Sequence, residues 1–260
     1  MTVAVPSSAI VRRPSPRLAE GEVTHVRRQP VDMTRALAQH AAYVDTLRSH
    51  GVRIVHAPPL DDHPDGVFVE DALVVLRDRA VLARPGAPSR RGEVDSLLAV
   101  VDALGLTSTR IVAPATLDGG DALVTDRHVF VGLSTRTNAE ALDQFAPVVM
   151  AAVGLEVVGV PVTRCLHLKS AVTALPDGSL VAVSDQLDLT PFMERRYAVH
   201  VVDEPSGGDV LCLGATVVLP ADAPRTTALL TALGFDVCAL DLSELQKIEA
   251  GATCMSVLVP

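Results

Sequence analysis

The sequence predicts an α/β fold made of about five repeated ββαβ units arranged in a ring. Three observations lead to this prediction. A helix–glycine–strand pattern recurs along the chain, hairpin patterns lie between its copies, and the two chain ends supply the strands of the one incomplete unit. An ordinary open α/β sheet with irregular insertions is the alternative. Because the ring closes only when both ends join the same unit, we expect a single domain over residues 1–260.

The helix–glycine–strand pattern combines apolar residues at helical spacing, a glycine suited to the left-handed C-terminal cap, and a run rich in Val and Ile. The four clear copies are YVDTLRSHGVRIVHAPP (43–59), LLAVVDALGLTSTRIVAP (97–114), APVVMAAVGLEVVGVPV (146–162) and TALLTALGFDVCALD (227–241). Their capping glycines are Gly51, Gly105, Gly154 and Gly234. The long gap before the last copy has room for a degenerate one, FMERRYAVHVVDEP (192–205).

Four hairpin patterns lie between these copies, each with two apolar strands around a tight polar or glycine turn. They are DALVVLRDRAVLARP (71–85), DALVTDRHVFVGL (121–133), SAVTALPDGSLVAVS (170–184) and DVLCLGATVVLP (209–220). The fifth unit lacks a hairpin of its own. A strand at CMSVLVP (254–260) and a strand at SAIVRRP (8–14) can pair to provide it, which closes the ring.

Composition excludes several classes of protein. Hydrophobic residues make up 48% and charged residues 20%, which is typical of a globular chain and not of a disordered one. The formal net charge of -9 disfavours nucleic acid as a partner and favours a small cation. Four cysteines are too few for a disulfide scaffold. The sequence shows neither a signal-peptide pattern nor an uninterrupted apolar span, so we expect a cytoplasmic protein that does not enter a membrane.

Polar residues gather just before the first hairpin strand of each unit, where a ring would bring them together at one end of its axis. They are Asp65, Glu70, Asp71, Asp118, Asp121, His167, Asp209 and Cys254. A thiol, a base within hydrogen-bond reach and a group that orients the base are what nucleophilic thiol catalysis requires. Taken alone, each residue also fits a structural role: Cys254 as a small core residue, His167 as a structural histidine. No CxxC, HExxH or HxH spacing indicates a metal site.

Six segments, in order and over essentially the whole chain, resemble the dimethylarginine dimethylaminohydrolase family of the pentein, or guanidine-modifying, superfamily. They are FVED (68–71), RPGAPSRRGEV (84–94), LDGGD (117–121), STRTN (134–138), LHLKS (166–170) and GATCMSV (251–257). The resemblance implies a five-bladed α/β propeller. It also implies hydrolysis of dimethylarginine or monomethylarginine to citrulline and an amine, through a covalent thiouronium intermediate on cysteine, with neither metal nor organic cofactor. A homodimer is left open.

The resemblance also implies a role for each matching residue. Cys254 would be the nucleophile, His167 the general acid and base, and Asp118 the group that orients His167. The implied substrate-binding residues are Asp71 with Glu70 for the guanidinium, Arg90 and Arg136 for the α-carboxylate, Asp65 and Glu249 for the α-amine end or the guanidinium, and Leu18 in the lid loop RLAEGE (17–22). Both arginines follow second hairpin strands whereas the carboxylates precede first strands, so we expect the basic and acidic groups to lie apart.

Two departures favour methylated arginine over arginine. Related deiminases carry His-X-Asp where this chain has His167-Leu168-Lys169, and losing that carboxylate would make room for N-methyl groups. They also tend to have Glu where this chain has Asp118. An arginine or other guanidine deiminase of the same superfamily stays open, as does a catalytically silent protein that binds arginine-like ligands. A papain-type hydrolase lacks any local signature around Cys254.

Overall fold

The computed structural model describes residues 5–260 and contains five three-stranded sheets. Residues 1–4 of the predicted domain lie outside the described residues. In the first sheet, β1 (Ser8–Val11) pairs antiparallel with β15 (Ser256–Val259) and parallel with β2 (Arg53–His56). The predicted pairing of the two chain ends is therefore confirmed.

Each of the other four sheets is an antiparallel hairpin with a third strand added in parallel on its second strand. They contain β3 (Leu73–Leu76), β4 (Arg79–Leu82) and β5 (Thr107–Arg110); β6 (Ala122–Val124), β7 (His128–Leu133) and β8 (Glu156–Pro161); β9 (Val172–Ala174), β10 (Leu180–Val183) and β11 (Val199–Val202); β12 (Leu211–Leu213), β13 (Thr216–Pro220) and β14 (Asp236–Leu240). All four predicted hairpins are confirmed, and so is the degenerate fifth copy, which provides β11.

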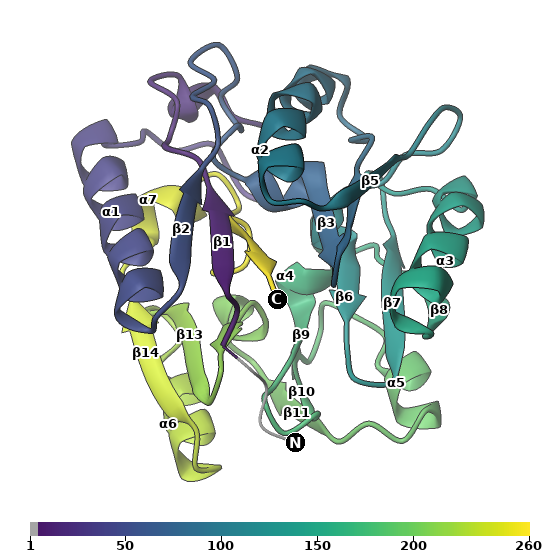
Figure 1. The fold of residues 1–260 in the computed structure, drawn as a ribbon. Helices are drawn as coiled ribbons and strands as arrows, with labels where there is room; N and C mark the ends of the chain where they lie inside the picture. The colour runs from purple at the N-terminus through teal and green to yellow at the C-terminus, as the bar shows by residue number, and fades with distance from the viewer. Residues whose placement is uncertain (1–4) are drawn as a thin grey trace.

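A helix precedes each parallel third strand, because a parallel connection must cross from one end of the sheet to the other. These helices are α1 (Met33–Ser49), α2 (Leu98–Ala103), α3 (Glu140–Val153), α5 (Thr190–Glu194) and α6 (Pro224–Ala232). The four glycines predicted to cap them have φ of +83°, +69°, +71° and +91° in chain order, a region that side chains other than glycine rarely adopt. Figure 1 shows these five helices at the periphery of the molecule.

Five apolar clusters hold consecutive sheets together. In chain order of the sheets, the first cluster packs Val257 against Leu73, and the second packs Val74 against Val129. The third includes Phe130 and Leu180, the fourth Val181 and Val217, and the fifth Val218 and Val11. The fifth cluster joins the last sheet to the first, so the apolar packing runs through all five sheets and returns to its start.

Short helical turns lie between the strands, and six of the ten candidate site residues lie in them or directly before them. They are η1 (Leu18–Glu20), η2 (Val69–Ala72), η3 (Pro88–Leu97), η4 (Gly119–Asp121), η5 (Pro205–Gly208), α4 (Leu168–Ala171) and α7 (Ser243–Gln246). Three of them, η2, η4 and α4, immediately precede the first strand of a hairpin, and two residues separate η5 from β12. No helix within residues 5–260 has the length and apolar character that crossing a membrane requires.

Candidate active site

The turns before the first hairpin strands bring the predicted polar residues together. Asp71 lies in η2, Asp118 directly precedes η4, and His167 is the N-terminal cap residue of α4. Their ligand atoms all lie within 4.8 Å of one another, although these residues come from three different sheets' turns. The convergence predicted from the repeat is found for this group.

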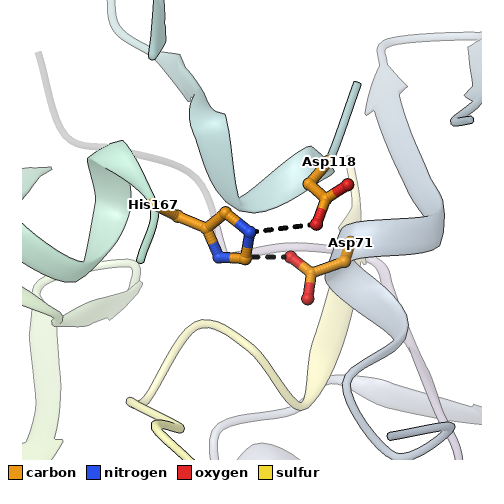
Figure 2. A group of neighbouring side chains, drawn as sticks. All are labelled: Asp71, Asp118 and His167. Carbon is orange, nitrogen blue, oxygen red and sulfur yellow. Dashed lines mark hydrogen bonds and ion pairs between the residues drawn. The ribbon is translucent and has the colours of Figure 1, made fainter. Parts of the chain in front are cut away.

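His167 is held between two carboxylates (Figure 2). Its Nε2 lies 3.0 Å from Asp118 Oδ2, and its Nδ1 lies 3.7 Å from Asp71 Oδ1. Burial opposes the charged imidazolium, but the Asp71 charge and the Asp118 hydrogen bond outweigh it and raise the pKa of His167 from 6.5 to about 9. His167 is therefore protonated at neutral pH. Because Nε2 is hydrogen-bonded to Asp118, Nδ1 is the imidazole nitrogen that can exchange a proton with a ligand.

The glycines of LDGGD allow this close approach. A Cβ on Gly120 would lie 2.6 Å from His167 Nδ1 and 2.7 Å from Asp71 Oδ1, closer than atoms can pack. The Gly120 N–H also donates to Asp71 Oδ1 at 3.2 Å. A glycine is thus required at position 120 because a side chain would clash with the imidazole. The need for a tight turn alone does not explain this glycine.

The expected separation of basic and acidic groups is wrong for Arg90. Its guanidinium donates to Asp71 and, at 2.8 Å, to Glu93, so it lies against the carboxylate assigned to the reacting end. The reason is that η3 folds back after β4 and returns Arg90 to the turn before β3. Burial opposes ionisation of Asp71, but the charges of His167 and Arg90 outweigh it and lower the pKa of Asp71.

The Cys254 thiol lies in a turn just before β15, as its place in the repeat predicts, although the strand starts at Ser256 and not at Cys254. Its Sγ accepts the Gly251 N–H at 3.4 Å and lies 3.9 Å from Asp209 Oδ2. Burial, together with the charges of nearby Asp209 and Glu70, raises the pKa of Cys254 well above 9. Cys254 is therefore a neutral thiol at neutral pH until a positive charge arrives beside it.

Cys254 and His167 line the same small cavity, whose volume is about 20 Å³. The cavity lining includes seven of the ten predicted site residues: Asp65, Asp71, Arg90, Arg136, His167, Glu249 and Cys254. Asp118 lies behind His167 and is fully buried. A volume of this size holds about one water molecule, so an amino acid enters only if part of the wall moves.

Leu18 and Glu70 do not line this cavity. Leu18 is fully buried in the apolar cluster that contains Phe68 and Ile248. Glu70 binds Lys169 Nζ at 2.6 Å and accepts the Thr253 hydroxyl at 2.8 Å. This ion pair lines a separate cavity of about 250 Å³. In this conformation Lys169 thus neutralises the carboxylate that was expected to help Asp71 hold a guanidinium.

A segment of chain that follows η1 closes the cavity. The main-chain N–H groups of Thr24 and Val26 donate to the Glu249 carboxylate at 2.6 and 3.0 Å, and the Glu22 N–H donates to Asp65. Asp65 and Glu249 therefore bind backbone of residues 22–26 here, where the sequence predicts that they bind substrate. In this conformation neither carboxylate is free to bind a ligand.

Arg136 differs from Arg90 in its partners. Among residues 5–260, no carboxylate oxygen lies within 4.0 Å of the Arg136 guanidinium, and its hydrogen bond goes to the Thr24 hydroxyl at 3.2 Å. A buried guanidinium without an acidic partner favours an anionic ligand. Arg136 is the cation of this cavity that is best placed to bind one.

Several residues that form the site had no predicted role. Phe68, Leu166, Ile248 and Ala250 also line the small cavity, together with Glu22 of the predicted lid loop. Asp209 faces the Cys254 thiol, and its position before the first strand of a hairpin marked it without giving it a role. The apolar residues carry no signal of their own, because nothing separates them from core residues until the cavity is known.

The cluster of Asp71, Asp118 and His167 has donor atoms that could bind a metal ion. Arg90 already neutralises Asp71, and the raised pKa of His167 keeps a proton on the imidazole. A metal ion would have to displace that proton and approach a cationic guanidinium. The donor set therefore fits an imidazolium between carboxylates better than it fits a metal.

Comparison with known proteins places the chain in a family. The family model for N,N dimethylarginine dimethylhydrolase, eukaryotic, matches residues 24–191. The N(G),N(G)-dimethylarginine dimethylaminohydrolase of Streptomyces coelicolor is 45% identical over 254 residues, which cover 96% of this chain and 95% of the relative.

Solved structures agree. A dimethylarginine dimethylaminohydrolase variant in an adduct with S-methyl-L-thiocitrulline superposes with a TM-score of 0.91 at 32% identity, covering 97% of this chain and 99% of the other. The Pseudomonas aeruginosa enzyme, a cysteine-to-serine variant with citrulline, gives a TM-score of 0.89 at 31% identity, covering 98% and 99%. The chain belongs to the dimethylarginine dimethylaminohydrolase family.

Proposed function

We propose that this protein hydrolyses dimethylarginine or monomethylarginine to citrulline and dimethylamine or methylamine. The observation that carries the proposal is one cavity lined by a thiol, a protonated histidine, carboxylates for a guanidinium and an arginine free to bind a carboxylate. Family membership gives the substrate class, since the related enzymes are named for dimethylarginine and one of them was solved with citrulline.

Asp71 and Asp65 hold the guanidinium, because a carboxylate is the natural partner of this planar cation. Arg136 binds the α-carboxylate, while Arg90 stays paired with Asp71 and Glu93 and holds the Asp71 carboxylate in place. The positive charge of the guanidinium offsets the carboxylates around Cys254 and lowers the free energy of the thiolate. The thiol proton then leaves to solvent, so the nucleophile forms when the substrate is bound.

The Cys254 thiolate attacks the central guanidinium carbon and forms a C–S bond. The C–N bond to the methylated nitrogen breaks while His167 Nδ1 gives that nitrogen its proton, because an amine leaves poorly as an anion. A thiouronium remains on Cys254. His167, now neutral, takes a proton from water, whose oxygen attacks the same carbon. The C–S bond breaks, citrulline forms, and the remaining proton of the water ends on the amine product.

The predicted lid loop (17–22), which contains η1 and Leu18, acts together with the closing segment that follows it as a lid that opens for substrate and closes over it. The five sheets are the blades of a five-bladed α/β propeller that forms one domain, supported by the circular order of the apolar clusters and by the peripheral helices in Figure 1. The cytoplasmic location and the homodimer stay predictions.

The test is a citrulline assay with asymmetric dimethylarginine, monomethylarginine, arginine and agmatine, compared by kcat/KM. We expect the methylated arginines to have the highest values. A higher kcat/KM for arginine would favour the deiminase alternative, and no citrulline from any of the four would favour the silent ligand-binding protein.

Arg136→Gln is expected to weaken substrate binding. Loss of a charged hydrogen-bonded pair from a buried site lowers kcat/KM by about 10- to 100-fold. The substrate α-carboxylate lies away from the reacting carbon, so we expect the change mainly in KM. Steady-state citrulline assays separate KM from kcat. Arg110→Gln, which removes an exposed arginine, is the control and should leave both values unchanged. A fall in kcat at unchanged KM would contradict the assignment.

A further inference from the structure

Three arginines line a cavity of about 260 Å³, the arginine cavity, to which the proposed mechanism gives no role. They are Arg84, which follows β4, Arg91 of η3, and Arg110, the last residue of β5. The other residues of the lining are Ala, Val, Ile or Pro, so within residues 5–260 no carboxylate belongs to it. In a chain with 31 acidic residues and 22 lysines and arginines, a cavity lined by positive charge alone favours a small anion.

The Arg84 and Arg91 guanidiniums keep most of their hydrogen-bond donors free. Arg84 Nη1 donates to the Ala115 carbonyl at 3.1 Å, and Arg91 Nε donates to the Pro85 carbonyl at 3.1 Å. In the described part of the chain each guanidinium makes this one hydrogen bond, and neither has a carboxylate oxygen within 4.0 Å. Because a guanidinium carries five N–H donors, both retain donors that match the oxygens of an oxyanion.

Arg110 differs from the other two arginines of this cavity. Arg84 and Arg91 are half-buried, whereas Arg110 is exposed and pairs with Asp95 at 2.6 Å. An exposed ion pair is worth little, and its two charges already offset each other. A partly buried guanidinium without an acidic partner has lost part of its hydration and gains more from an anion. The anion site is therefore formed by Arg84 and Arg91.

Arg84 and Arg91 lie at the two ends of one segment, residues 84–91, that contacts the active site. Between them, the Gly86 N–H donates to Asp118 Oδ1 at 2.9 Å. A Cβ on Gly86 would lie 2.3 Å from the carbonyl oxygen of Arg136, so the segment packs directly against the Arg136 backbone. An anion that bridges the two arginines would therefore join the ends of a segment that positions catalytic and binding groups.

The neighbour of Arg91 in η3 belongs to the active site. Arg90 donates to Asp71 and Glu93 and lines the small cavity, whereas Arg91 lines the arginine cavity. Because the two residues are consecutive, any constraint on the position of Arg91 also constrains the position of Arg90.

We propose that the arginine cavity binds a small dianion such as phosphate, which bridges Arg84 and Arg91 and holds residues 84–91 against the active site. Two guanidiniums balance two negative charges, and each can offer paired N–H groups to phosphate oxygens. The volume is below the roughly 300 Å³ at which pockets for drug-sized ligands begin, so it suits phosphate or a small phosphate monoester. The net charge of -9 opposes a nucleic acid. This site does not rest on the proposed function, whereas its effect on citrulline formation does.

Calorimetric titration with inorganic phosphate at pH 8, where it is mainly a dianion, tests the site. The ionic strength is held constant with chloride, because salt screens exposed charges. We expect the wild type to bind phosphate, Arg91→Gln to bind it about tenfold more weakly or worse, and the double variant Arg84→Gln with Arg91→Gln to show no binding. Arg91→Lys keeps the charge without the planar fork and should have an intermediate affinity.

Two control variants show where the anion binds. Arg225 also lines a cavity, of about 230 Å³, but it pairs with Asp203 at 3.0 Å, so Arg225→Gln should leave the phosphate affinity unchanged. Arg136→Gln removes the guanidinium of the small cavity and should leave it unchanged too. A loss of affinity in Arg136→Gln and not in Arg91→Gln would place the anion in the small cavity and overturn the inference. So would the absence of phosphate binding by the wild type.

Methyl phosphate distinguishes two sources of the ligand. It carries the same dianionic group as inorganic phosphate, and Arg91→Gln should weaken the binding of both. Tighter binding of methyl phosphate by the wild type would identify a phosphorylated metabolite as the ligand, and weaker binding would identify inorganic phosphate. Binding of methyl phosphate that is unchanged in Arg91→Gln would contradict the site.

Hydrogen exchange tests whether the anion holds residues 84–91. With phosphate, amides of this segment should exchange about tenfold more slowly in the wild type and at an unchanged rate in Arg91→Gln. At saturating dimethylarginine, where competition between phosphate and substrate for Arg136 has no effect, phosphate should raise the kcat of the wild type about fivefold. If the wild type formed no citrulline, titration and exchange would still decide the inference. Phosphate binding that leaves the exchange of this segment unchanged would overturn its hold on the active site.

Discussion

Replacing Cys254 with serine is expected to lower kcat for citrulline formation by about 10⁵-fold or more, because a serine hydroxyl in this position has neither the nucleophilicity of a thiolate nor a base that makes one. Binding should survive, since the hydroxyl is smaller than the thiol and the carboxylates and Arg136 are unchanged. The citrulline assay measures the loss, and calorimetric titration with citrulline measures the binding.

Cys238→Ser is the matched control for this experiment. Cys238 is a partly buried cysteine in β14, and it does not line the small cavity that contains Cys254. Its replacement should leave kcat within about a factor of two and should still allow alkylation of one reactive thiol. A Cys254→Ser protein that kept a tenth of the wild-type kcat would refute the covalent mechanism.

The protonation state of the Cys254 thiol leads to a second prediction, which concerns how its rate of alkylation depends on pH. Because burial and three carboxylates raise its pKa well above 9, alkylation of the free protein should be slow at pH 7 and accelerate as the pH rises through 9 and beyond. A bound guanidinium favours the thiolate, so turnover should persist at pH values where the free protein barely reacts. Equal rates of alkylation at pH 7 and pH 10 would contradict this assignment.

Much of the fold could be predicted because each unit is specified by local signals. A tight turn between two apolar runs, and a glycine after an amphipathic helix, depend on residues within about 20 positions of each other. The pairing of β1 with β15 was harder to predict, since these strands lie at opposite ends of the chain. It followed from counting: four complete hairpins and two unpaired terminal strands left one arrangement that pairs every strand.

The candidate site residues also differ in whether local sequence signals could predict their positions. His167 and Asp118 could be found because each occupies the same place in its unit, and repetition then implies proximity. Arg90 was misplaced because η3 reverses direction after β4, and the spacing of residues along a loop does not determine its path. Asp209 and Cys254 are 45 residues apart in the chain, and only their packing shows that they touch. The same holds for Glu249, whose partners are main-chain N–H groups far away in sequence.

Asp118→Asn should lower kcat by about 10²- to 10⁴-fold while leaving the fold intact. The Gly86 N–H donates to Asp118 Oδ1 at 2.9 Å, so an asparagine keeps its oxygen there and turns its NH₂ toward His167. Nε2 must then accept a hydrogen bond, which leaves a neutral imidazole with its proton on Nδ1. That ring is a poor acid, because losing the Nδ1 proton would leave an anion.

The pH dependence of the free energy of unfolding should also change in Asp118→Asn. A histidine with a pKa raised to about 9 in the folded state binds a proton more tightly than the unfolded chain, whose histidine has a pKa near 6.5. Its contribution to the free energy of unfolding is fully present below pH 6.5 and is lost as the pH rises through 9. In Asp118→Asn this part of the pH dependence should shrink, which thermal unfolding at pH 6, 7.5 and 9 measures.

A double variant decides whether Asp118 acts through His167. If Asp118 only orients and charges the imidazole, then Asp118→Asn combined with His167→Gly should be no slower than His167→Gly alone, because the group on which Asp118 acts is absent. An independent structural role predicts that the two losses multiply. The citrulline assay on the two single variants and the double variant separates these cases, and a multiplicative loss would remove Asp118 from the proposed mechanism even with the hydrogen bond in place.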